Sequence, residues 1–219
     1  MLLTNIPTGL YVRLMTPAAH PAKDPEGTRA RILQAAFHEF YKHGFQGGSL
    51  NHIVEMAGTT KGALFHHFAG KQELGYAVLD EVIGPVMHQR WVSTLVDSLD
   101  PLADIKRSFR QFVREDIKSG HFVQGCPLNN LAQEMSPLDE GFRKRIDKLY
   151  LAWRKHVAAA LVEGIKAGTV RRGIVPEQAA ALIVASQMGI WGTGKSSRSP
   201  ELMREAGEAV CAYLDSLAP

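Results

Sequence analysis

Cysteine is scarce in this chain of 219 residues, which contains only Cys126 and Cys211. Two thiols cannot build the disulfide framework of a small secreted protein, and their scarcity fits a reducing cytoplasm. Long apolar runs are also missing, because the longest, residues 179–191, is interrupted by polar residues and by Gly189. A membrane-spanning helix needs about 18 or more apolar residues, so we expect no span and a cytoplasmic protein.

The chain also lacks the short motifs that mark common enzyme sites. It has no His-Glu-x-x-His pair, no glycine-rich phosphate loop and no Gly-x-Ser-x-Gly turn. The adjacent histidines His66 and His67 and the distant His88 do not make a ligand set at metal spacing. We therefore predict no enzyme, no cofactor and no metal site.

The alternation typical of β-strands is hard to find, whereas helix-forming residues are plentiful. The hydrophobic fraction of 45% permits a substantial core. We predict an all-α fold of about nine helices. Beside two short helices within residues 49–71, the expected ranges are 26–43, 71–96, 101–119, 127–135, 139–167, 176–191 and 201–217.

The stretch from Ser49 to Lys71 reads as two short helices joined by a tight turn. Ser49 is a good N-terminal cap, and apolar residues follow it at helical spacing. Gly58 tolerates the left-handed backbone that ends a helix, and Thr60 is placed to cap the next one. This arrangement makes a helix-turn-helix, a motif whose second helix enters the major groove of DNA.

The segment 32–74 resembles the DNA-binding domain of the TetR family of bacterial transcriptional regulators. The resemblance rests on the order and spacing of Ile32, Ala35, Ala36, Phe37, Phe40, Gly44, Phe45, Ser49, Ile53, Ala57, Gly58, Thr60, Lys61, Gly62, Leu64, Phe65, His67, Phe68 and Lys71. Two places depart from the family pattern. Phe65 stands where Tyr is usual, and the Thr59-Thr60 pair stands where a small apolar residue and Ser are usual.

The resemblance implies a homodimeric repressor that binds a palindromic operator in double-stranded DNA and is released by a small-molecule effector. The residues expected at the DNA are Ser49, Thr60, Lys61, Gly62, Ala63, Phe65, His66 and Lys71. The first turn of the second helix would face base edges, and Ser49 and Lys71 would hold flanking phosphates. For Ser49 and Phe65 the alternative is a purely structural role in capping and packing.

Charge limits how strongly this segment holds DNA without regard to sequence. Residues 24–74 carry five basic and five acidic side chains, so their net charge is zero. Non-specific affinity scales with the number of phosphates neutralised, so we expect a few placed contacts instead. The neutral charge balance also supports an alternative function, a helical interaction dimer that does not bind DNA. The intact Thr60-Lys61-Gly62 turn argues against this alternative.

The C-terminal part reads as a regulatory and dimerisation domain. The expected helix 176–191 is apolar nearly all round, so it needs cover on every side, and a second copy is the simplest cover. The resemblance implies the same, a dimer through the last two helices. Residues 192–200 are rich in Gly and Ser and read as a loop. Pro85 lies inside the expected helix 71–96, where it predicts a kink.

The effector is expected to bind in a mainly apolar pocket with a few polar groups. The candidate lining residues are His88, Trp91, Phe112, Cys126, Asn129, Trp153, Met188 and Trp191. Aromatic residues at such spacing are more often ordinary core. Cys126 precedes Pro127 at a helix start, where the helix dipole can lower a thiol pKa. An electrophile- or redox-sensing repressor acting through Cys126 is therefore an alternative, and a small buried residue is the simpler reading.

The first residues show no clear periodicity and several prolines. We interpret residues 1–24 as a flexible N-terminal arm, with Met15 as an alternative start. The chain then divides into this arm, a helix-turn-helix domain at 25–72 and a ligand-binding and dimerisation domain at 73–219.

Overall fold

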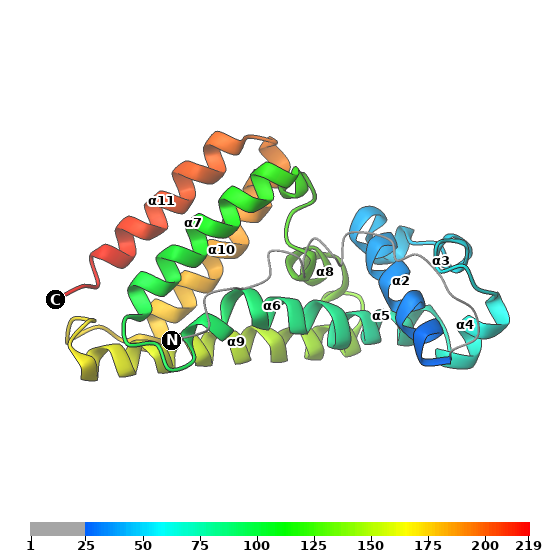
Figure 1. The fold of residues 1–219 in the computed structure, drawn as a ribbon, viewed down its shortest axis with the longest axis horizontal. Coiled ribbons are helices and arrows are strands. Elements are labelled where there is room, and N and C mark those ends of the chain that lie inside the picture. Colours follow the sequence, from blue (N-terminus) through cyan, green and yellow to red (C-terminus); the bar gives the residue numbers. More distant parts are fainter. Residues whose placement is uncertain (1–24) are drawn as a thin grey trace.

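The computed structural model describes residues 25–219, so the predicted arm at 1–24 and the alternative start at Met15 lie outside the described residues. Within the described range every regular element is a helix, which confirms the all-α fold class. The molecule is elongated, with three helices at one end and a larger helical bundle at the other (Figure 1).

The three helices at that end are α2 (Pro25–Gly47), α3 (Leu50–Met56) and α4 (Lys61–His67). The shorter two have seven residues each and would be marginal alone, so they depend on packing against α2. Their shared core includes Ile32, Ile53 and Leu64, none of which has exposed surface. Near its end α2 breaks at Gly44, whose φ of 76° and ψ of 166° lie outside the helical region.

The connection to the bundle differs from the single helix expected over 71–96. It consists of α5 (Lys71–Val78), a π-helical segment η1 (Leu79–Ile83), α6 (Gly84–Trp91) and a 3₁₀ turn η2 (Ser93–Leu95). The cause is Pro85, which cannot donate to a helix ladder. The extra residue in the π segment places Pro85 in the first turn of α6, where the missing N–H is harmless.

The bundle contains α7 (Pro101–Ser119), a 3₁₀ turn η3 (His121–Gln124), α8 (Pro127–Met135), α9 (Glu140–Ala167), α10 (Pro176–Ser197) and α11 (Pro200–Asp215). The expected starts at Asp100-Pro101 and Pro127 are confirmed. α9 runs beneath α5 and α6, while α7, α10 and α11 pack together across it (Figure 1).

The expected loop at 192–200 is wrong, because α10 continues to Ser197. Two hydroxyl groups bond back to carbonyls one turn earlier, Thr193 to Gly189 at 2.8 Å and Ser196 to Gly192 at 3.1 Å. Gly194 is buried where α10 meets α11, and a Cβ there would lie 2.5 Å from Met203 Cγ. Gly194 therefore reflects close helix packing, while the Thr193 and Ser196 hydroxyls find acceptors within α10 itself.

Among residues 25–219, no helix has both the length and the hydrophobicity needed to cross a bilayer.

Candidate nucleic-acid interface

The first turn of α4 is exposed to solvent and is capped by Thr60. Thr60 has extended backbone angles, and its Oγ1 accepts a hydrogen bond from the Ala63 amide at 3.2 Å. Thr60, Lys61 and Gly62 are exposed, whereas Leu64 on the opposite face is fully buried. The turn therefore presents a cation and a glycine whose bare backbone leaves room for close approach.

Phe65 and His66 extend this exposed surface by one turn of α4. The Phe65 side chain is 51% exposed, so the alternative reading that it packs into the core does not hold. Its ring is therefore accessible beside the exposed first turn of α4. His67 is half-buried and Phe68 is buried, so neither extends the exposed surface of α4.

Ser49 and Lys71 have structural partners within the protein. Ser49 Oγ accepts the His52 amide at 3.4 Å, and its own amide donates to Glu39 Oε1 at 2.8 Å. Lys71 Nζ donates to the Gln46 carbonyl at 2.9 Å. Ser49 remains exposed and Lys71 is half-buried, and the Lys71 ammonium carries two further N–H donors for the phosphate contact that we expect.

The bundle is attached to the domain of α2, α3 and α4 near the break in α2. Glu134 on α8 accepts the Phe45 and Gln46 amides at 2.9 and 2.8 Å. Tyr41 on α2 donates its hydroxyl to the Gly125 carbonyl, just before α8, at 2.6 Å. The residues just before α8 and those near its end are thus both hydrogen-bonded to the C-terminal part of α2.

The four large aromatic residues expected to line a pocket are instead packed on one another. The Trp91 ring lies 5.0 Å from Phe112 and 5.5 Å from both Trp153 and Trp191, measured between centroids. All four side chains are buried. In this conformation they form core, and a ligand would have to part them.

Sequence reasoning missed the polar groups beside these rings. Asp116 on α7 is buried and accepts Arg90 at 3.0 Å and the Trp191 indole Nε1 at 2.6 Å. The available signal was position, because Asp116 continues the apolar spacing Ile105, Phe109 and Phe112. Gln187 on α10 is also buried, and its Oε1 has no hydrogen-bond partner among the described residues.

Cys126 lies at the start of α8, as expected, but its thiol is buried. Burial raises the pKa of the Cys126 thiol, and the Asn129 and Leu128 amides only partly oppose this effect. The expectation that the helix start lowers this pKa is therefore wrong. The loss of solvation of the thiolate raises the pKa more than the two amide hydrogen bonds lower it.

Asn129 and Met188 lie together nearby. The Asn129 side chain donates to the Met188 carbonyl at 3.4 Å, and the Tyr150 hydroxyl contacts Met188 Sδ at 3.1 Å. Burial raises the Tyr150 pKa above its ordinary value. His88 is exposed beside His156 and borders a cavity of about 60 Å³ that Trp153 also lines.

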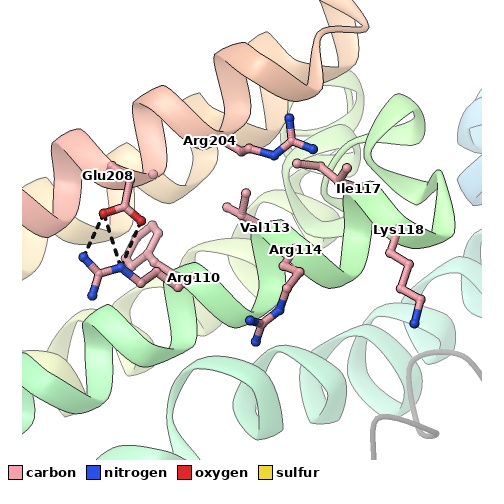
Figure 2. A pocket seen from close by; sticks show the side chains of 9 residues that line it. Arg110, Val113, Arg114, Ile117, Lys118, Arg204 and Glu208 are labelled. Carbon is pink, nitrogen blue, oxygen red and sulfur yellow. Dashed lines mark hydrogen bonds and ion pairs between the residues drawn. The ribbon is translucent and has the colours of Figure 1, made fainter.

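A larger groove of about 580 Å³ lies between α7 and α11. In Figure 2, Val113 and Ile117 face α11, and Arg110 reaches Glu208 across one end of the groove. Arg114 and Lys118 project from the outer side of α7 (Figure 2) and have no hydrogen-bond or ion-pair partner among the described residues. None of the candidate effector residues from the sequence lines this groove.

Two family models match the chain. The model described as bacterial regulatory proteins, tetR family, matches residues 32–78, and the tetracyclin repressor-like C-terminal domain matches residues 100–210. The transcriptional repressor DhaR of Mycobacterium sp. strain GP1 is 26% identical over 163 residues, which are 74% of this chain and 79% of DhaR. The repressor NemR of Escherichia coli K12 is 26% identical over 184 residues, covering 82% and 89%.

Solved structures show the same fold. The reduced form of E. coli NemR superposes with a TM-score of 0.74 at 24% identity, covering 88% of this chain and 97% of NemR. A TetR family regulator from Cytophaga hutchinsonii gives a TM-score of 0.80 at 20% identity, covering 91% and 98%. The two family models cover both parts of the chain, and the relatives are transcriptional regulators and not enzymes. The chain therefore belongs to the TetR family of DNA-binding transcriptional regulators, whose members act as dimers.

Proposed function

We propose that this protein is a repressor that binds a palindromic operator as a homodimer, with α4 of each protomer in the major groove. The observation that carries the proposal is the exposed first turn of α4, capped by Thr60 and extended by Phe65. Lys61 and the α4 amides supply positive charge toward phosphates and base edges, with Ser49 at the flank. A two-fold dimer reads two half-sites, so a palindrome is expected.

The last two helices are the proposed dimer interface, within a regulatory domain that we keep at residues 73–219, after the DNA-binding domain at 25–72. Leu182 on α10 is 48% exposed, and Ala185 and Gly189 lie exposed at helical spacing beside it. Leu202 on α11 is 37% exposed. These apolar and small side chains allow close approach of a second α10–α11 pair, which would form a four-helix bundle.

The proposed effector site is the buried polar set among the bundle helices. It comprises the buried Asp116 and Gln187 and the half-buried Arg90 and Asn129, beside the tryptophan cluster. An unpartnered buried oxygen costs about 1–3 kcal/mol, so the Gln187 Oε1 favours a ligand group that donates to it. Binding here would require the rings of Trp91 and Trp153 to move apart.

Helix α8 is the proposed route from effector to DNA. Its first turn carries Asn129, and its last turn carries Glu134, which holds the end of α2. A shift of α8 on effector binding would move α2 and with it the spacing of the two recognition helices. The Arg29–Glu81 ion pair between α2 and η1, at 2.5 Å, provides a second connection. Effector and DNA affinities would then be coupled reciprocally.

The α7–α11 groove is a second candidate for the effector, favoured by its volume. Ligand pockets commonly measure about 300–1,000 Å³, which the groove meets without rearrangement and the cavity beside His88 does not. Arg114 and Lys118, which have no ion-pair partner within residues 25–219, would favour a ligand with a carboxylate. Effector release lost in Arg114→Ala but retained in Asn129→Ala would assign the groove, and the reverse result would assign the buried set.

The test of DNA binding is fluorescence anisotropy on a duplex from upstream of the protein's own gene, with a scrambled duplex as control. We expect selective, salt-weakened binding of two protomers. Lys61→Ala should reduce the slope of log affinity against log salt by about 1 if Lys61 neutralises one phosphate. No selective binding at low salt, together with unchanged behaviour of Lys61→Ala, would favour the interaction dimer without DNA binding.

Sensing through Cys126 is the remaining alternative, and its burial and raised pKa argue against it. The thiolate is the reactive form, so a buried thiol reacts slowly. We expect N-ethylmaleimide to leave the operator complex intact in wild type and in Cys126→Ser. Release of the wild type alone would establish the sensor.

A further inference from the structure

Three side chains with metal-binding atoms meet between α2 and α3, outside the proposed DNA and effector sites. They are Glu39 and His43 on α2 and His52 on α3. One ligand atom from each lies within 4.8 Å of those of the other two. The two α2 residues are four positions apart and so share one face of the helix. His52 reaches the same place from the N-terminal turn of α3, so the group exists only in the folded domain.

The surroundings of Glu39, His43 and His52 suit each side chain to bind a metal ion. The Glu39 carboxylate is 4% exposed and is oriented by the Ser49 amide on Oε1. Its Oε2 lies 2.6 Å from His52 Nδ1. His43 is exposed and makes no hydrogen bond among the described residues, so its ring is free to turn. Burial acts to raise the pKa of Glu39, but the Ser49 amide and the two histidines together hold it below its ordinary value.

We propose that Glu39, His43 and His52 bind a divalent transition metal ion of the zinc class. Two imidazoles and one carboxylate are a known zinc ligand set, with a fourth position left to water or another ligand. Tetrahedral ligands about 2.0–2.2 Å from zinc lie roughly 3.4 Å from one another. Rotation of the two exposed histidine rings would widen the 2.6 Å contact between Glu39 and His52 and shorten the longer separations, which reach up to 4.8 Å, to about this value.

The simpler reading is that the Glu39–His52 contact only anchors α3. That reading explains the contact at 2.6 Å and the Ser49 amide, but it gives His43 no role. It also predicts that removing His43 has no consequence. The two readings therefore differ at one residue, and His43 is the side chain on which the test depends.

The test is isothermal titration of the full-length, tag-free protein with Zn²⁺, supported by the absorption spectrum of the Co²⁺ form. We expect one ion per protomer and cobalt ligand-field bands without the intense thiolate charge-transfer band that Cys126 or Cys211 would give. His43→Asn should weaken binding by more than about tenfold, because even indirect ligand support is worth 10- to 100-fold.

The matched control is the double variant His66→Asn and His67→Asn, which removes two neighbouring histidines from the same domain. It should bind zinc as the wild type does. His52→Asn serves as a second ligand variant, whereas Glu39 is left intact because its carboxylate holds the Ser49 amide. No saturable binding by the wild type, or equal binding by His43→Asn, would overturn the proposed site.

A consequence for DNA binding rests in addition on the proposed function. A cation that joins α2 to the first turn of α3 adds positive charge near Ser49 and restrains the helix-turn-helix, so operator affinity should rise with zinc and fall with a chelator. His43→Asn should lose this response. Since the titration uses no DNA, failure of the metal site and failure of the repressor function are distinguishable. Zinc binding with unchanged operator affinity would overturn the regulatory consequence alone.

Discussion

At the scale of single residues, Leu64 and Phe65 separate the core from the proposed DNA-facing surface. Its neighbour Leu64 has no exposed surface, whereas Phe65 is 51% exposed on the same helix. Substitution of an exposed side chain usually changes folding stability by no more than about 0.5 kcal/mol. A large effect of Phe65 on DNA binding would therefore be separable from any effect on folding.

We predict that Phe65→Ala weakens operator binding by about tenfold or more and leaves the melting temperature almost unchanged. Phe65 would contact a thymine methyl or a sugar, and complete burial of a phenylalanine side chain contributes about 1.5–3 kcal/mol. Anisotropy and thermal melting measure the two effects. Val123→Ala, an exposed apolar residue in η3, is the control and should alter neither. Phe65→Tyr should bind at least as well as wild type, because the hydroxyl can reach a phosphate.

Asp139 is a residue whose ionisation should stabilise the fold. Its Oδ1 caps α9 by accepting the Phe142 amide at 2.8 Å and also accepts the Tyr76 hydroxyl at 2.7 Å. The Phe142 amide is the largest cause of the lowered pKa of Asp139, with the Tyr76 and Gln72 donors adding to it. A carboxylate with a lowered pKa stabilises the fold above its unfolded pKa of about 4, and the contribution is lost as the pH falls below that value.

We predict that Asp139→Asn flattens the loss of unfolding free energy between pH 5 and pH 2, about the range over which an unfolded aspartate titrates. The amide keeps an acceptor for the cap but carries no charge. Asp139→Ala should cost about 1 kcal/mol at pH 7 through loss of the cap. Urea unfolding at several pH values measures both. Asp147→Asn, an exposed acid on the same helix, should retain the wild-type slope.

At the scale of elements, pattern and capping predicted α7, α8 and the start of α9 because local signals govern them. Asp100, Cys126-Pro127 and Asp139 mark their starts in sequence. The predictions of helix boundaries were wrong where contacts between residues far apart in the sequence determine the structure. The length of α10 depends on Met203 packing over Gly194, and the π segment η1 ends just before Gly84, where a Cβ would lie 3.2 Å from Leu149.

The same distinction applies to the candidate sites. The α4 surface follows from a local motif, so the sequence sufficed to propose it. Asp116, Gln187 and the Glu39–His43–His52 group owe their significance to partners far along the chain or to burial, which no local pattern reveals. An acid within an apolar stripe, as at Asp116, is the local sign that such partners exist.

Helix α8 allows the attachment of the two domains to be tested through Glu134. Removing its carboxylate in Glu134→Ala leaves the Phe45 and Gln46 amides without their partners. Hydrogen bonds to a charged group contribute about 1.5–3 kcal/mol, so the melting temperature should fall by several degrees. Operator affinity should fall as well, because α2 is no longer held. Gln133→Ala, on the exposed face of the same helix, is the control. Equal melting of both variants would remove α8 as the proposed connection.

At the scale of the whole molecule, the arrangement of recognition helices depends on a second protomer, which the exposed α10–α11 surface is proposed to bind. Leu182→Glu tests this directly, because a two-fold interface would bring two buried carboxylates together. Like charges at an interface cost several kcal/mol, so dimer affinity should fall more than about 100-fold. Sedimentation should then detect monomers, and operator binding should be lost with the second half-site contact.

Leu151→Glu is the matched control, since Leu151 is 44% exposed on α9, away from the proposed interface, and should leave the dimer intact. If Leu182→Glu also sediments as a dimer, the recognition helices are held apart by some other surface, and the proposed route through α8 would have to act within a different assembly.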